Sequence, residues 1–407
     1  MLAAMRWRRL LVPVACGLAA AGLAGLAVVA AARPQGGDLS ALVRMAAQPP
    51  LGPDALARDP SFHVLPKNSY DGQFYWAVAA DPLATGSVHD DLDDPPYRYG
   101  HPLYSWLALL ASGGQVRALS EALVATGLLA MFVAGTAAGL LAVSLGRSAW
   151  WGLAVAVNPG LLVAVMNDLA EPLAAALLLL GLLAYVRGRR GAAIAAFALA
   201  SFAKEPLLLV APALAAWELV RRRTTLRDAA ALAAAPLPAL AWWVWLRIQL
   251  GSWPFAGGAG GLGTPLEGWR RALLENGRKL YLLDPDTYQM ADAHIALLLA
   301  TGALLGVLAA VALRLRGPAD AAFLPLVLIL ACVTISVTAY PKDLLRAAAL
   351  ALVLAPFLGR SAAAALGDAP EREPERQPQG VQQAQGRHEP VVEREGPGRD
   401  VVDAQEA

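Results

Sequence analysis

The stretch "LLVPVACGLAAAGLAGLAVVAAA", residues 10–32, decides the fold class, because it holds 23 residues without a charged side chain. An α-helix rises 1.5 Å per residue, so this stretch would be about 34 Å long and could cross the hydrocarbon core of a bilayer. Arg6, Arg8 and Arg9 precede it. A secretory signal peptide begins in a similar way. However, the apolar length and the further apolar stretches downstream favour a retained first membrane helix with a cytoplasmic N-terminus.

The composition of the whole chain agrees with a membrane protein. Of its 407 residues 57% are hydrophobic and only 16% are charged, whereas soluble domains are about a quarter charged. The net charge of +1 argues against a nucleic-acid partner, which would require a basic surface. Cys16 and Cys332 both lie in apolar runs, so we expect two buried thiols and neither a disulfide framework nor a metal site.

Ten apolar stretches predict membrane spans and therefore an all-α, polytopic membrane fold. They are residues 10–32, 118–146, 149–166, 172–187, 191–203, 206–220, 228–248, 294–313, 320–339 and 344–360. Arginine clusters follow alternate spans and indicate the cytoplasmic side. All clusters fall on one side only if residues 102–112 do not cross. That stretch is too short to span, so we expect a re-entrant or interfacial half-helix there.

The spans divide the chain into four parts. These are the first helix (1–32), a large extracytoplasmic loop (33–117), a helical membrane bundle (118–360) with a second outer loop (249–293), and a tail (361–407). The tail is too polar to bury a core, so we expect it to be disordered and cytoplasmic.

The second outer loop holds two recognisable segments. The stretch "GWRRALLENGRKLYLL", residues 268–283, alternates apolar and charged side chains at helical spacing, which predicts a helix lying in the interface plane. The stretch "GGAGGLG", residues 257–263, lacks the Lys-Ser/Thr ending of a phosphate-binding loop, so we interpret it as a flexible connector.

Charged residues gather at the turns that we expect to face outward. The turns are "MNDLAEPL" with Asp168 and Glu171, "SFAKEPLL" with Lys204 and Glu205, and "TAYPKDLLRAA" with Tyr340, Lys342, Asp343 and Arg346. Charge at membrane depth is costly and is usually functional. The turns therefore predict a polar vestibule that opens outward. The alternative is that they are ordinary surface turns and that the span boundaries differ by a few residues.

The first outer loop contains the aromatic and acidic stretch "SYDGQFYWAVAADP", residues 69–82. A short helix after Asp71 would place Tyr70, Phe74 and Val78 on one face and end at Asp81. Asp71 could cap that helix, or it could act as a general base. Aromatic rings beside carboxylates suit carbohydrate, which makes Tyr70 and Tyr75 candidate sugar-binding residues.

The stretch "HDDLDDPPYRYGHPLYSW", residues 89–106, follows in the same loop. We interpret its run of four aspartates as a solvated loop rather than a metal site. Arg98 lies between Tyr97 and Tyr99, where a planar guanidinium could hold an anionic group. Cations near a carboxylate base would offset the charge of a departing phosphate. These groups together describe glycosyl transfer from a phosphate-linked donor.

The order of these features resembles the GT-C-type integral membrane glycosyltransferases of bacteria, in particular the subgroup linked to cell-surface glycopolymer formation. The resemblance covers roughly residues 1–360. It rests on "YDGQFYWAVAADP", "PPYRYGHPLYSWLALL", "NPG…NDLAEPLAAALLL", "LASFAKEPLLL" and "YPKDLLRAAALALVLAPFL". It implies a polyprenyl-phosphate sugar as donor, a lipid-linked or polysaccharide acceptor, and transfer on the outer face of the cytoplasmic (inner) membrane. It also implies that Asp71 is the catalytic base, with inversion at the anomeric carbon.

The resemblance also implies roles for the other charged residues. The donor phosphate would meet Arg98, Lys342 and Arg346, and His101 stands where the related pattern often has Arg. Candidates for binding the acceptor or the sugar are Asp168, Glu171, Lys204 and Glu205. Related enzymes differ in their use of a divalent metal. Asp71 with Asp168 or Glu171 would supply oxygen ligands for one, although nothing in the sequence requires a metal.

Two other functions fit the same residues. A transporter or flippase for a lipid-linked glycan would also place charged pairs and short, proline-interrupted helices inside the membrane. The chain shows no internal repeat, and its charges gather at one face, so we favour the enzyme. The third function is a non-catalytic scaffold of an envelope-assembly complex, with the polar tail as its docking element.

Overall fold

The computed structural model describes residues 2–48, 50–66, 69–256, 261–281 and 285–360, and the predicted tail lies outside them. Every regular element in these ranges is a helix, and the two isolated β-bridges, Ala46–Leu65 and Leu262–Val333, belong to no strand. The predicted all-α class is therefore confirmed.

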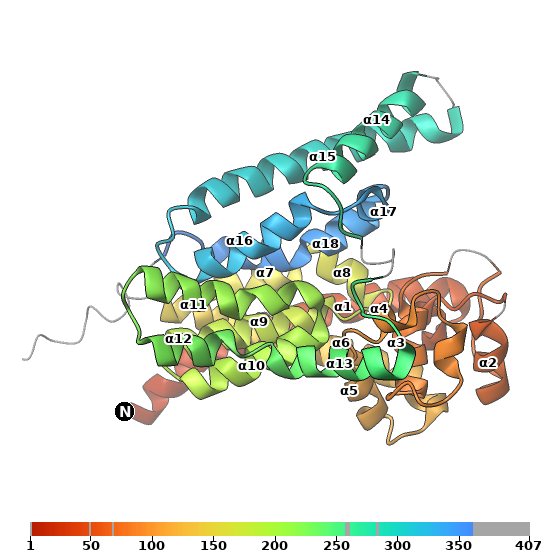
Figure 1. Cartoon of the computed structure of the whole chain (residues 1–407), viewed down its shortest axis with the longest axis horizontal. Coiled ribbons are helices and arrows are strands. Elements are labelled where there is room, and N and C mark those ends of the chain that lie inside the picture. The colour runs from red at the N-terminus through yellow and green to blue at the C-terminus, as the bar shows by residue number, and fades with distance from the viewer. Residues whose placement is uncertain (1, 49, 67–68, 257–260, 282–284, 361–407) are drawn as a thin grey trace, which may run out of the picture. The chain divides into compact units, whose positions relative to one another are not determined.

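Helices that pack one against the next form the main body of the fold (Figure 1). Helix α1 (Leu2–Ala32) packs along α6 (Leu119–Ser144), α6 packs on α9 (Glu171–Val186), and α9 packs on α10 (Arg190–Ala203). Small residues allow the close approach of α1 and α6. A Cβ atom on Gly17 would lie 2.5 Å from the carbonyl oxygen of Phe132, and one on Gly135 would lie 2.8 Å from that of Cys16. Such small-residue contacts are typical of helices that associate in membranes.

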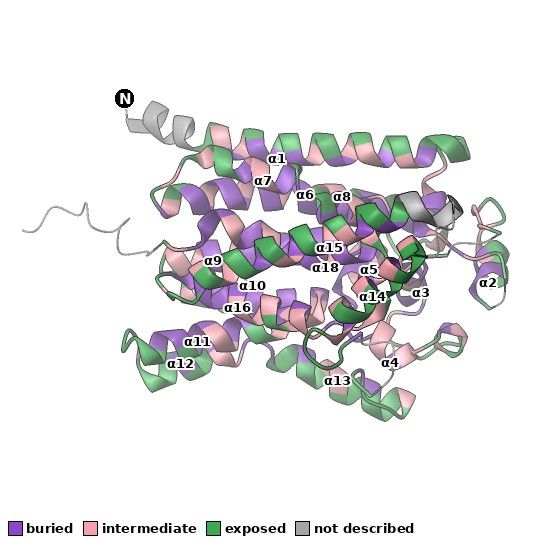
Figure 2. Cartoon of the chain, turned by 90° about the horizontal axis from the view of Figure 1, so that it is seen from above, coloured by how far each residue is buried: buried purple, intermediate pink, exposed green. Residues whose placement is uncertain are grey.

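Three helical stretches in the described ranges are long and apolar enough to cross a membrane. They are Leu10–Gln35, Val116–Ser144 and Met290–Ala312. Helices α12 (Leu226–Ala233) and α13 (Leu237–Leu250) would make a fourth, bent by 43°. Figure 2 shows exposed residues along α1 and α15 (Pro285–Ala312), where apolar side chains such as Leu299 and Val307 suit contact with lipid.

The structure does not confirm the predicted ten spans. Residues 149–166 are not one helix but η5 (Ala149–Gly152), α7 (Leu153–Ala156) and α8 (Pro159–Val165). The break follows from the sequence Asn158-Pro159. The Asn158 side chain accepts hydrogen bonds from the N–H groups of Gly160 and Leu161 and so caps a new helix. Pro159 occupies its first position, where a missing N–H costs nothing.

The segment between α1 and α6 folds into short helices. They are η1 (Arg33–Gln35), η2 (Leu39–Val43), α2 (Leu51–Arg58), α3 (Gly72–Ala80), η3 (Val88–Asp91), α4 (Pro95–Arg98), α5 (Leu103–Ala111) and η4 (Val116–Ala118). Helix α3 begins directly after Asp71 and ends at Asp81, as predicted. Helix α5 matches the predicted half-helix in length.

The remaining helices complete the fold. They are η6 (Glu205–Leu209), α11 (Val210–Val220), α14 (Glu267–Tyr281), α16 (Pro318–Ala331), α17 (Ile335–Thr338), α18 (Pro341–Leu354) and η8 (Ala355–Phe357). Helix α14 confirms the predicted helix at residues 268–283, the last two of which lie outside the described ranges. It exposes Arg270 and Arg271 and buries Ala272 and Asn276. The predicted glycine connector lies mostly outside the described ranges.

Candidate active site

Asp71 is held in place by the backbone on either side of it. The Tyr70 N–H donates a hydrogen bond to the carbonyl oxygen of Arg44 (3.1 Å). Gly72 packs so tightly that a Cβ atom there would lie 2.5 Å from the carbonyl oxygen of Asn167 and 2.7 Å from that of Val43. Only glycine fits this position. The start of α3 is therefore wedged between the chain after α1 and the turn between α8 and α9.

The Asp71 side chain binds two arginines and does not cap α3. One carboxylate oxygen, Oδ2, lies 2.6 Å from Nη1 of Arg346, and Oδ1 lies 3.4 Å from Nη1 of Arg98. No hydrogen bond joins the carboxylate to the N–H groups of α3, so the capping interpretation is wrong. Burial would raise the pKa of Asp71, but the charges of Arg346 and Arg98 outweigh it and lower that pKa to about 2. The Asp71 side chain is still 31% exposed, so solvent or a ligand can reach its carboxylate.

Two further side chains hold Arg98 in place. Its Nε and Nη2 atoms each lie 2.9 Å from a carboxylate oxygen of Asp93, and its guanidinium lies 3.6 Å from the centre of the Phe74 ring. Such fork-shaped pairing and stacking orient a guanidinium strongly. The Asp93 side chain is 58% exposed, as expected for a solvated loop, and it also positions Arg98.

Arg346 connects Asp71 to a buried chain of alternating charges. Its Nε atom lies 3.5 Å from Oε1 of Glu171, and the same oxygen lies 3.1 Å from Nζ of Lys204. The Glu171 side chain is only 3% exposed. Helix α18 carries Arg346 and is fixed against α8 by Asn158, whose amide donates to the carbonyl oxygen of Ala349 (3.0 Å). Four predicted site residues from three helices and a loop thus lie together.

Tyr70, Lys342 and Asp343 form the neighbouring wall of the site. The Tyr70 hydroxyl donates a hydrogen bond to Asp343, and Nζ of Lys342 lies 3.8 Å above the centre of the Tyr70 ring. Arg44, which the sequence did not indicate, donates from Nε to Oδ1 of Asn167 (3.2 Å). Within the described residues, neither Arg44 nor Lys342 has a carboxylate within ion-pair distance. Arg44 carried no signal in the sequence beyond being a lone arginine after the first apolar stretch.

A second group of predicted residues lies beside the first. Nδ1 of His101 lies 3.4 Å from Oε2 of Glu205, and the Tyr97 hydroxyl lies 3.4 Å from Oε1. The His101 ring also meets the edges of Tyr75 and Tyr97. Burial lowers the pKa of His101 to about 4 despite the nearby Glu205 carboxylate. His101 is therefore uncharged at neutral pH, so the geometry does not favour its predicted role on a phosphate.

Asp168 does not face the site. Its side chain is fully buried, its carboxylate oxygens have no hydrogen-bond partner in the described residues, and its backbone is left-handed, with φ of 49°. Helix α9 begins only at Glu171, so Asp168 lies before it, in the turn. Asp71 and Glu171 each pair with Arg346 instead of converging on a common point. The predicted oxygen-ligand set for a metal is thus not formed by these residues.

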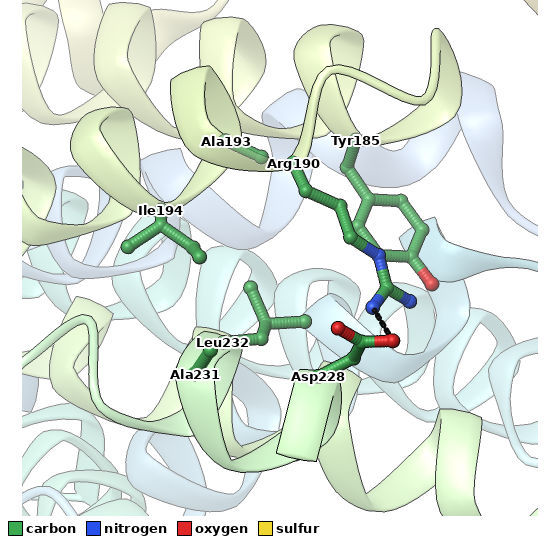
Figure 3. Close-up of a pocket in the computed structure, with 7 residues that line it drawn as sticks. All are labelled: Tyr185, Arg190, Ala193, Ile194, Asp228, Ala231 and Leu232. Carbon is green, nitrogen blue, oxygen red and sulfur yellow. Dashed lines mark ion pairs between the residues drawn. The ribbon is translucent and has the colours of Figure 1, made fainter. Parts of the chain in front are cut away.

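A separate cluster joins α9, α10, α11 and α12, and Figure 3 shows its members Tyr185, Arg190 and Asp228. Arg190 pairs with Glu218 (2.8 Å) and Asp228 (3.3 Å), and the Tyr185 hydroxyl donates to Glu218 (2.8 Å). From the sequence, the arginines of this turn were interpreted only as markers of the cytoplasmic side. Arg190 also holds four helix ends together, which is a structural role.

The chain matches no known family model, no curated protein and no solved structure. Its function therefore rests on the geometry of the residues around Asp71.

Proposed function

We propose that the protein is an integral membrane glycosyltransferase of the GT-C type. It moves a sugar from a polyprenyl-phosphate donor to a hydroxyl group of a cell-envelope glycan or lipid, on the outer face of the cytoplasmic membrane. The observation that carries this proposal is the reachable Asp71 carboxylate, 2.6 Å from Arg346 and 3.4 Å from Arg98. A base and two cations at one point are what transfer from a phosphate ester requires.

The proposed step uses these groups as follows. Asp71 accepts the proton of the acceptor hydroxyl while the hydroxyl oxygen attacks the anomeric carbon of the sugar. The bond between that carbon and the phosphate oxygen breaks, and its electron pair stays on the oxygen, so polyprenyl phosphate leaves. Arg346 and Arg98 offset the negative charge that develops on the leaving phosphate. Attack from the side opposite the phosphate inverts the anomeric carbon.

Polar and aromatic groups beside Asp71 support sugar binding. Glu205 has a side chain that is 29% exposed and lies within 3.4 Å of the Tyr97 hydroxyl. A carboxylate of this kind accepts hydrogen bonds from sugar hydroxyls, and the rings of Tyr70 and Tyr97 offer apolar faces to sugar C–H groups. Tyr75 is buried and supports His101 rather than lining the surface.

One observation favours a transporter as the second candidate. Glu171 and Lys204 form an ion pair between the ends of α9 and α10, and Asp168 is buried without a hydrogen-bond partner among the described residues. Ionisable groups in such positions mark ion and proton pathways in many transporters. In the transferase, the same pair holds Arg346 in place.

The deciding experiment measures transfer from radiolabelled polyprenyl-phosphate sugars by the purified chain in nanodiscs, with crude membrane lipids as acceptor. Asp71→Asn keeps the shape and removes the base, and Asp90→Asn is the matched control because it changes the same charge at a side chain that is 74% exposed. We expect labelled product with wild type and Asp90→Asn and none with Asp71→Asn. Equal labelling with all three proteins would remove Asp71 from the mechanism. Movement of the labelled donor across the membrane of proteoliposomes, without transfer of its sugar, would favour the transporter.

A further inference from the structure

We propose that Asp71 occupies, in the unliganded protein, the anion site that the donor phosphate takes, so that donor binding releases Asp71 to act as the base. This inference rests on the proposed function and adds an order of events to it. The donor binds first, and only then can the carboxylate receive the proton of the acceptor.

The two arginines point at Asp71 without depending on it. Asp93 engages Nε and Nη2 of Arg98, which leaves Nη1 for Asp71. Glu171 lies on the Nε side of Arg346, which likewise leaves Nη1 for Asp71. Each guanidinium is thus oriented by a second carboxylate, Asp93 for Arg98 and Glu171 for Arg346. Together they form an anion site whose geometry would persist if Asp71 moved away.

The Asp71 side chain, unlike its backbone, is held by few other contacts. In the described residues its carboxylate makes hydrogen bonds only to Arg98 and Arg346, and it takes no part in capping α3. Its side chain is the most exposed of the three, at 31% against 14% for Arg98 and 16% for Arg346. A rotation of this one side chain therefore opens the site without unpacking the backbone around Gly72.

The phosphate of the donor can replace Asp71 at this site. It is a diester that joins the sugar to the polyprenyl chain, so it carries one negative charge and two free oxygens, as a carboxylate does. When the sugar is transferred, the polyprenyl phosphate becomes a monoester with about 1.5 to 2 negative charges. Arg44 and Lys342 lie in the adjoining wall without a carboxylate partner among the described residues, so they add attraction for the phosphate in both states. These two further cations favour exchange of Asp71 for phosphate.

The exchange resolves a chemical difficulty of the resting site. A carboxylate whose pKa lies at about 2 is a weak base. The arginines cause this low value, because burial alone would raise the pKa of Asp71. Once a phosphate neutralises the arginines, the pKa of Asp71 rises and the carboxylate becomes a stronger base. Acceptor activation is thereby coupled to donor binding.

The test measures binding of farnesyl phosphate, a short polyprenyl phosphate, to the purified full chain by titration calorimetry. Asp71→Asn removes the competing charge, so we expect it to bind farnesyl phosphate at least about tenfold more tightly than wild type. Asp90→Asn, with the same change in net charge, should bind as wild type does. Asp71→Ala provides a second variant in case the asparagine variant does not fold. Farnesol, which lacks the phosphate, should show no difference between the proteins.

Equal or weaker binding of farnesyl phosphate by the folded Asp71 variants would overturn the inference. An equal gain for farnesol would also overturn it, because the effect would then arise from the lipid chain. The binding assay needs neither a sugar nor a transfer reaction, so its outcome does not depend on whether the proposed function is right. Tighter binding by Asp71→Asn, together with no transferase activity in the wild-type protein, would support the anion site and contradict the proposed enzyme.

Discussion

Nζ of Lys204, at the end of α10, lies 3.1 Å from Oε1 of Glu171, at the start of α9, and both side chains are largely buried. The pair joins two helix ends, and the same oxygen of Glu171 lies 3.5 Å from Nε of Arg346. Removing Lys204 leaves Glu171 paired with Arg346, but removing Glu171 leaves the buried Lys204 without a carboxylate at ion-pair distance among the described residues. Removing both side-chain charges leaves Arg346 paired with Asp71.

We therefore predict that Glu171→Gln lowers stability by about 3–5 kcal/mol, and that Glu171→Gln combined with Lys204→Met recovers most of the loss. Thermal unfolding of the purified variants in detergent measures both effects. If the double variant were as unstable as Glu171→Gln alone, the unpaired charge of Lys204 would not be the cause of the loss.

Gly72 gives a prediction about the position of Asp71. A Cβ atom there would clash with the carbonyl oxygens of Asn167 and Val43, and backbone atoms cannot turn aside as side chains do. We expect Gly72→Ala to cost about 1–3 kcal/mol of stability and to abolish transfer, because Asp71 would move away from the arginines. Gly25→Ala in α1 is the control, since a Cβ atom there meets nothing within 4 Å. Normal activity in Gly72→Ala would contradict the tight placement of Asp71.

The sequence predicted the fold class and the main site residues because both depend on local signals. The apolar length of residues 10–32 is enough to predict α1. Isolated charges in apolar surroundings need partners, which brought Arg346 and Glu171 into the predicted vestibule. Their pairing with Asp71 is a contact between distant segments, and no local pattern specifies which acid meets which base.

The failures have equally physical causes. Residues 149–166 are apolar enough for a span, but Asn158 and Pro159 start a new helix inside them. Asp168 was a candidate for binding the acceptor or the sugar, but its side chain is fully buried and its backbone is left-handed. Arg44 comes into the site only because the chain after α1 hydrogen-bonds to Tyr70.

His101 gives a prediction about stability and pH. Its pKa is lowered to about 4 from an ordinary value of 6.5 because burial disfavours its charged form. The unfolded chain thus takes up this proton near pH 6.5, while the folded chain resists it down to about pH 4. The free energy of unfolding therefore keeps its full value above pH 6.5. As the pH falls from 6.5 to 4, proton uptake by the unfolded chain lowers it by up to about 3 kcal/mol. His101→Gln should flatten that part of the stability profile in thermal unfolding, and His63→Gln, outside the site, should leave it unchanged.

The exchange of Asp71 for donor phosphate predicts two different pH profiles for the same reaction. The acid limb of kcat/KM reports the base in the unliganded protein, and that of kcat reports the base in the complex with substrate. With the pKa of Asp71 at about 2 before donor binding, kcat/KM should show no decline caused by Asp71 at any pH where the protein stays folded. Once phosphate holds the arginines, Asp71 should titrate as an ordinary aspartate, so kcat should fall as the pH drops through about 4. Steady-state rates between pH 3.5 and 8 measure both limbs. A common acid limb for kcat and kcat/KM would show that donor binding leaves the basicity of Asp71 unchanged.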